Sequence, residues 1–123
     1  MSKILIVEDD PATAELERAI LEVEGLKCLV AGDGAMAMKM IEKEKPLLIL
    51  LDIMLPGMDG YQLSQLIKHN LKYSDIPIIM ISAKVSKEDQ KLGFEKGADE
   101  YIIKPFEPSC LIGIVRKFLS ASA

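Results

Sequence analysis

The segment Ile4-Leu-Ile-Val-Glu-Asp-Asp-Pro11 joins a short apolar run to three consecutive acids and a proline. An apolar run this short is too brief for a buried helix, so it predicts a strand that is covered on both faces, as in a parallel sheet. Asp10 before Pro11 is the order expected for the N-cap and the first position of a helix. The segment therefore predicts a strand that passes directly into a helix, with carboxylates at the junction.

The same alternation of strand and helix recurs along the chain. Compact apolar runs at residues 47–51, 76–81 and 101–103 predict further buried strands, and a weaker run at 27–31 predicts an edge strand. Five strands that alternate with five helices predict an α/β fold, a doubly wound parallel sheet covered on both faces. A flavodoxin-like strand order, 2-1-3-4-5, fits better than a Rossmann dinucleotide fold, whose glycine-rich loop is here replaced by acids.

The first and last helices show apolar stripes that are expected to face the sheet. In the first helix the stripe residues are Leu16, Ala19, Ile20 and Val23. The polar residues that flank this stripe are expected to face away from the sheet, namely Glu15, Glu17, Arg18 and Glu22. In the last helix the stripe residues are Leu111, Ile114, Val115 and Phe118. Cys110, Ile112 and Leu119 then form an apolar outer face, which predicts a contact with a partner or a second copy.

The composition is that of an ordinary globular domain. The chain has 123 residues, of which 50% are hydrophobic and 28% charged, enough for one domain with a sizeable core. Its net charge is −4, whereas nucleic-acid-binding modules are usually basic, so we expect no direct nucleic-acid binding. No apolar stretch approaches the ~20 residues of a membrane span. Cys28 and Cys110 form no metal-binding pattern, which predicts reduced, partly buried thiols in a cytoplasmic protein.

Carboxylates gather at the carboxyl ends of the two strands expected at the centre of the sheet. Glu8 and Asp9 follow the first strand, and Asp52 ends the third. Like charges at short range disfavour one another unless a cation intervenes, so the cluster predicts a Mg²⁺ site or a catalytic role. Solvated loop acids are the simple alternative for Glu8 and Asp9, and an N-cap for Asp10. Asp52 is harder to dismiss, because a carboxylate after an apolar run is costly if it is buried unpaired.

Ser82 and Lys104 follow the fourth and fifth strands and are therefore expected at the same edge of the sheet. A hydroxyl can donate a hydrogen bond to one phosphoryl oxygen, and an ammonium can pair with another. Taken singly, each is more simply a surface residue. Together with the acids they form a set that is suited to binding a phosphoryl group.

Four motifs carry a family resemblance, in order and with family-like spacing. They are Ile4-Leu-Ile-Val-Glu-Asp-Asp10, Leu51-Asp-Ile-Met-Leu-Pro-Gly-Met-Asp-Gly60, Ile81-Ser-Ala83 and Gly97-Ala-Asp-Glu-Tyr-Ile-Ile-Lys-Pro-Phe106. From Lys3 to about Leu119 the chain closely resembles the response-regulator receiver domain of two-component signalling. The resemblance implies one receiver domain over residues 1–123, with an ordered core at about 3–119.

The resemblance also implies roles for the acidic residues. Asp52 corresponds to the aspartate that takes a phosphoryl group from the phosphohistidine of a sensor histidine kinase or a phosphotransfer protein. Asp9 would bind Mg²⁺ directly, Glu8 would act through water, and Met54 would offer its backbone carbonyl. Asp52 would complete the set of metal ligands.

Further positions match the switching parts of the family. Ser82 corresponds to the switch hydroxyl, Tyr101 to the aromatic residue that reorients with it, and Lys104 to the lysine that pairs with the phosphoryl group. The peptide bond between Lys104 and Pro105 is expected to be cis. The usual signalling surface is the fourth helix, fifth strand and fifth helix, where a downstream effector or a second copy would bind after phosphorylation.

Two positions are expected to tune hydrolysis of the phosphoryl group, namely Met54 and Lys84. Neither side chain can accept a proton from water, so the resemblance predicts a long-lived phospho-Asp52.

Two other functions remain open at this point. A phosphatase or phosphotransferase of the haloacid-dehalogenase type needs a second aspartate two residues after Asp52, where this chain has Met54. A flavodoxin needs a Thr/Ser-rich phosphate loop after the first strand, where this chain is acidic. We therefore expect a signalling domain that catalyses only its own phosphorylation and dephosphorylation.

Overall fold

The computed structural model describes residues 3–121, in which five strands alternate with five helices. The strands are β1 (Lys3–Val7), β2 (Lys27–Ala31), β3 (Leu48–Asp52), β4 (Ile78–Ser82) and β5 (Glu100–Ile103). The helices are α1 (Pro11–Val23), α2 (Gly34–Glu44), α3 (Gly60–Lys68), α4 (Lys87–Glu95) and α5 (Pro108–Ala121). All neighbouring strands pair in parallel in the order β2-β1-β3-β4-β5, which confirms the predicted fold.

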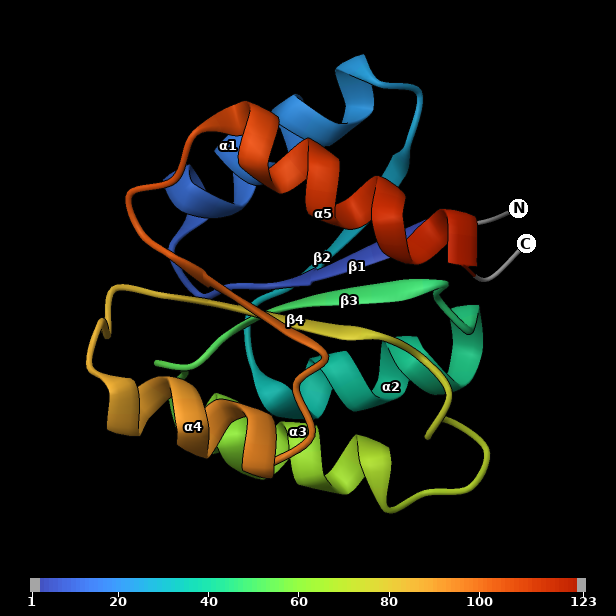
Figure 1. The fold of residues 1–123 in the computed structure, drawn as a ribbon. Coiled ribbons are helices and arrows are strands. Elements are labelled where there is room, and N and C mark those ends of the chain that lie inside the picture. Colours follow the sequence, from blue (N-terminus) through green and yellow to red (C-terminus); the bar gives the residue numbers. More distant parts are fainter. Residues whose placement is uncertain (1–2, 122–123) are drawn as a thin grey trace.

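The sheet lies between two layers of helices. Helices α1 and α5 cover one face, and α2, α3 and α4 cover the other (Figure 1). Side chains alternate between the two faces along each strand, so Leu5 and Val7 belong to one apolar cluster and Ile4 and Ile6 to the other. The central strands are buried on both sides, which explains why they read as continuous apolar runs in the sequence.

The junction after β1 is short and tightly defined. Asp10 is the N-cap of α1, where its side chain accepts a hydrogen bond from the Thr13 amide at 3.1 Å, and Pro11 occupies the first position of the helix. Only Glu8, Asp9 and Asp10 separate β1 from α1. This confirms the predicted helix start and leaves the acids at the carboxyl edge of the sheet.

The inward face of α1 differs from the predicted stripe. Ala14, Glu17 and Leu21 are buried, whereas Leu16 is 56% and Val23 84% exposed. Both stripes have helical spacing, so periodicity alone does not choose between them. The capped start immediately after β1 sets the rotation of the helix about its axis, and that rotation brings Glu17 inward.

The outer face of α5 is smaller than predicted. Leu119 is partly buried and packs against the apolar cluster shared with α1, so it does not belong to an exposed face. Cys110 is exposed and Ile112 is partly exposed, as predicted. The separate prediction that both thiols are partly buried is wrong, because Cys28 is buried and Cys110 is exposed.

Candidate functional site

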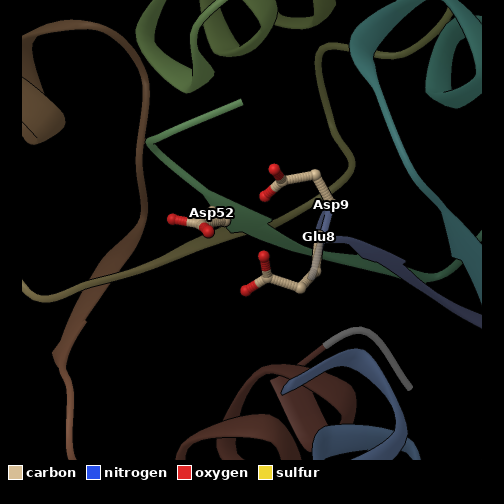
Figure 2. Close-up of side chains that lie close together, drawn as sticks. All are labelled: Glu8, Asp9 and Asp52. Atoms are coloured by element: carbon tan, nitrogen blue, oxygen red, sulfur yellow. The ribbon is translucent and has the colours of Figure 1, made fainter. Parts of the chain in front are cut away.

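Three carboxyl groups meet at the carboxyl edge of the sheet. Glu8 and Asp9 follow β1, and Asp52 is the last residue of β3, which pairs directly with β1. One carboxylate oxygen from each residue lies within 4.8 Å of the other two. Figure 2 shows the three side chains projecting from the two strand ends around one space. Parallel pairing of the two strands is what brings these residues together.

Lys104 places an ammonium among these acids. Its Nζ lies 2.9 Å from Glu8 Oε1 and 3.5 Å from Asp52 Oδ2. Burial by itself lowers the pKa of Lys104, but the hydrogen bond to Glu8 and the charge of Asp52 outweigh it and raise the pKa above its usual value. Lys104 therefore stays charged in a site where its partner Glu8 is almost fully buried.

Backbone amides orient two of the carboxylates. The Asp10 amide donates to Glu8 Oε2 at 3.1 Å, and the Met54 amide donates to Asp52 Oδ1 at the same distance. The side chain of Asp52 is only 11% exposed, so its carboxylate is mostly buried and is oriented by the Met54 amide. Fixed carboxylates of this kind suit a nucleophile or a metal ligand.

The predicted switch residues lie on the neighbouring strands. Ser82 ends β4 and is buried, and its Oγ accepts a hydrogen bond from the Lys84 amide at 3.1 Å. Tyr101, on β5, donates from its hydroxyl to the Lys84 carbonyl at 2.9 Å. Burial raises the pKa of the Tyr101 phenol, and the nearby Ser82 hydroxyl offsets part of this rise. The Lys104–Pro105 peptide bond is cis.

The two predicted hydrolysis-tuning residues border a pocket beside Asp52. The pocket has a volume of about 320 Å³, and Met54 and Lys84 both line it. The Met54 side chain is 63% exposed, so it stands at the mouth of the site rather than in the core.

Sequence reasoning missed two residues near the site. Glu17 is 2% exposed, and burial together with the charge of Glu8 raises its pKa to about 8. Tyr61, in the first turn of α3, lines the pocket beside Asp52 and packs its ring under the Lys84 ammonium, with 6.0 Å between Nζ and the ring centroid. The Ala14–Glu17–Leu21 spacing could have indicated Glu17, but no local pattern indicates Tyr61.

The donor set at the edge of the sheet fits Mg²⁺. Glu8, Asp9 and Asp52 supply three carboxyl groups against the single ammonium of Lys104, so a divalent cation would balance the remaining charge. Asp9 is exposed and forms no ion pair with another residue in the range 3–121, which leaves its oxygens accessible to a metal. Hard oxygen ligands and access to water are what Mg²⁺ prefers.

Comparison with known proteins places this geometry in a family. The response regulator receiver domain family matches residues 4–116. The DNA-binding response regulator MtrA of Mycolicibacterium smegmatis is 42% identical over 93% of this chain and 49% of its own length. The phosphate regulon regulatory protein PhoB of Pseudomonas aeruginosa is 42% identical over 94% of this chain and 51% of its own length. The chain thus spans about half the length of these curated relatives.

Solved structures agree with the sequence comparison. A putative response regulator from Chloroflexus aurantiacus superposes with a TM-score of 0.93 at 34% identity, covering 97% of this chain and 98% of that one. The receiver domain of a signal transduction histidine kinase from Syntrophus aciditrophicus superposes with a TM-score of 0.92 at 34% identity, covering 98% and 92%. Within residues 3–121, no helix is long and apolar enough to cross a bilayer. The chain belongs to the response regulator receiver domain family of two-component signalling.

Proposed function

We propose that Asp52 accepts a phosphoryl group from the phosphohistidine of a sensor histidine kinase or a phosphotransfer protein, with Mg²⁺ as cofactor. A carboxylate oxygen of Asp52 attacks phosphorus as the P–N bond breaks, and the imidazole leaves with the bonding electrons and takes a proton from solvent. The observation that carries the proposal is the position of Asp52, mostly buried, oriented by the Met54 amide and 3.5 Å from the Lys104 ammonium.

The surrounding residues supply the rest of the chemistry. When bound, Mg²⁺ would neutralise charge on the phosphoryl oxygens, and Asp9, Asp52 and the Met54 carbonyl would hold it, with Glu8 acting through water. Lys104 would exchange its contact with Asp52 for one with the phosphoryl group. The buried Ser82 hydroxyl, on the neighbouring strand, would donate to another phosphoryl oxygen.

We further propose that the domain acts on no outside substrate and that its output is a change of binding surface. The surface comprises α4, β5 and α5, where Phe94 is 46% and Ile103 36% exposed, and Cys110 and Ile112 extend it. Exposed apolar side chains of this kind suit a downstream effector or a second copy of the phosphorylated chain. DNA binding belongs to MtrA as a whole protein. The domain itself carries a net charge of −4, which argues against direct nucleic-acid contact.

The test is chemical phosphorylation. Incubation with acetyl phosphate and Mg²⁺ should add ~80 Da to the intact protein, the mass of one phosphoryl group. The adduct should disappear in Asp52→Asn and persist in Asp75→Asn, a matched control at an exposed acid before β4. Absence of the adduct in the wild-type protein, or its survival in Asp52→Asn, would refute the proposal.

A further inference from the structure

Met54 and Met36 are the exposed methionines of residues 3–121. Met54 is 63% exposed, and Met36 is 44% exposed. The other methionines of this range are buried or pack against the apolar core, namely Met38, Met40, Met58 and Met80. A thioether is open to oxidation where solvent reaches it, so an oxidant in solution meets Met54 before the other methionines.

Met54 also lies beside the residue that we propose is phosphorylated. Its amide donates to Asp52 Oδ1 at 3.1 Å, and its side chain lines the pocket of about 320 Å³ next to Asp52. Lys84 also lines this pocket, but its ammonium is only a hydrogen-bond donor. The Asp59 carboxylate, another polar group of the lining, accepts from the Gln62 amide at 2.9 Å and caps α3. A change in the polarity of the Met54 side chain would therefore act directly on water that enters the pocket.

Peroxide converts a thioether into a sulfoxide. The sulfur donates an electron pair to one oxygen of hydrogen peroxide as the O–O bond breaks, and an S–O bond forms. Sulfur is thereby oxidised, and the peroxide is reduced and leaves as water after a proton shift. The thioether is a weak hydrogen-bond acceptor, whereas the sulfoxide is polar and its oxygen accepts hydrogen bonds readily.

We propose that Met54 is a site of reversible oxidation by hydrogen peroxide, and that its sulfoxide shortens the lifetime of phospho-Asp52. This inference rests on the proposed phosphorylation of Asp52. The sulfoxide oxygen would accept a hydrogen bond from a water molecule in the pocket and orient that water beside the phosphoryl group. One hydrogen bond to the attacking water corresponds to about a twofold to tenfold faster loss of the phosphoryl group. Methionine sulfoxide reductases reverse the oxidation.

The two cysteines need a control, because peroxide also oxidises thiolates. Cys110 is exposed, so Cys110→Ser is the background in which every comparison is made. Cys28 is buried, and burial together with the charge of Glu22 raises the pKa of its thiol to about 11. Its thiolate is therefore scarce at neutral pH, and Cys28 should stay reduced.

The test treats the Cys110→Ser chain with hydrogen peroxide and removes the excess with catalase. Peptide mass spectrometry then locates the added oxygen, which we expect at Met54 first and at Met36 more slowly. The oxidised protein is phosphorylated with acetyl phosphate and Mg²⁺, and loss of the adduct is followed after the donor is removed. The half-life should be about twofold to tenfold shorter than in the untreated protein, and it should recover after treatment with methionine sulfoxide reductase.

Three variants assign the effect to one sulfur. In Met54→Leu, peroxide should leave the half-life at its untreated value, because the thioether is absent. Met36→Leu removes the other exposed thioether, on α2, and should retain the full effect of peroxide. Met54→Gln carries a carbonyl oxygen without oxidation, so its adduct should be lost faster than that of Met54→Leu before any peroxide is added.

The outcomes separate this inference from the proposed function. A Met54 that stays reduced while Met36 is oxidised, an unchanged half-life after oxidation of Met54, or a shortening that persists in Met54→Leu would each overturn the inference. Absence of an adduct in the untreated chain would instead refute the phosphorylation of Asp52, and with it the effect on lifetime. The peptide masses decide the site of oxidation independently of phosphorylation.

Discussion

Gly60 packs directly against the main chain of Asp52, so closely that a Cβ at position 60 would lie 2.5 Å from the Asp52 carbonyl oxygen. The Gly60 amide also donates to the Ile53 carbonyl at 2.8 Å. The start of α3 therefore fixes the end of β3, where the proposed phospho-acceptor lies. The contact involves two backbones, so neither side can yield by changing a side-chain rotamer.

Gly60→Ala should therefore displace Asp52 and lower both stability and phosphorylation. Overpacking of this kind typically costs about 1–3 kcal/mol, which urea denaturation can measure alongside the rate of adduct formation with acetyl phosphate. Gly113→Ala is the matched control, because a Cβ at position 113 meets nothing within 4 Å. That substitution should stabilise α5 slightly through helix propensity. Unchanged phosphorylation in Gly60→Ala would show that the contact does not position Asp52.

Glu17 should make the stability of the domain depend on pH. Burial raises its pKa from 4.5 to about 8, so the folded protein keeps the proton over a range in which the unfolded chain has lost it. The associated stability is complete below pH 4.5 and is lost as the pH rises toward 8. Glu17→Gln should therefore be more stable than wild type at pH 8.5, by up to about 4 kcal/mol. At pH 5 the free energies of unfolding of the two proteins should be more nearly equal.

Urea denaturation at the two pH values in the presence of EDTA measures this difference without metal binding. Glu15→Gln, at an exposed position of the same helix, should change stability by the same small amount at both. A Glu17→Gln advantage that does not grow with pH would contradict the assigned environment of Glu17.

Asp9 should be needed for the metal but not for the fold. Its side chain is exposed, so Asp9→Ala should leave the urea midpoint nearly unchanged but abolish Mg²⁺-dependent phosphorylation. Asp10→Asn is the neighbouring control, since an amide oxygen can still cap α1. Normal Mg²⁺-dependent adduct formation in Asp9→Ala would exclude Asp9 as a ligand.

The sequence predicted the positions of the acidic site residues more accurately than it predicted which faces of the helices are buried. The acids could be placed because each follows an apolar run, and parallel pairing of β1 and β3 brings the ends of those runs together. Glu17 was misplaced because two stripes of α1 share one spacing, and only the capped start at Asp10 distinguishes them. Tyr61 was missed because its contacts with Lys84 and Asp89 join α3 to a distant segment, which no local pattern records.

The exposed face of α5 should be needed for binding a second copy or a partner. Ile112→Glu should leave phosphorylation intact and abolish any increase in mass that sedimentation detects after addition of beryllofluoride and Mg²⁺. The charge would have to be buried in an apolar contact, which is costly. Ser120→Glu, at an exposed position near the end of the same helix, controls for added charge. If the wild type shows no mass change and a partner complex survives Ile112→Glu, neither the dimer nor the partner contact uses this face.

The lifetime of phospho-Asp52 should be long, because neither of the two predicted tuning residues, Met54 and Lys84, can activate water. Met54 has no group that orients a water molecule, and its exposed side chain should shield the phosphoryl group. Lys84 is only a donor, and its ammonium lies over the ring of Tyr61. We therefore expect the adduct to persist for minutes or longer after the donor is removed.

Replacing Met54 with Asn and Lys84 with Glu should speed loss of the adduct, because an amide and a carboxylate can together orient and deprotonate the attacking water. Since Lys84→Glu also releases Tyr61, Lys84→Met is the necessary control, and it should not accelerate hydrolysis. Mass spectrometry after rapid removal of acetyl phosphate gives the half-lives, and a wild-type half-life of seconds, or no acceleration in the double variant, would contradict this account.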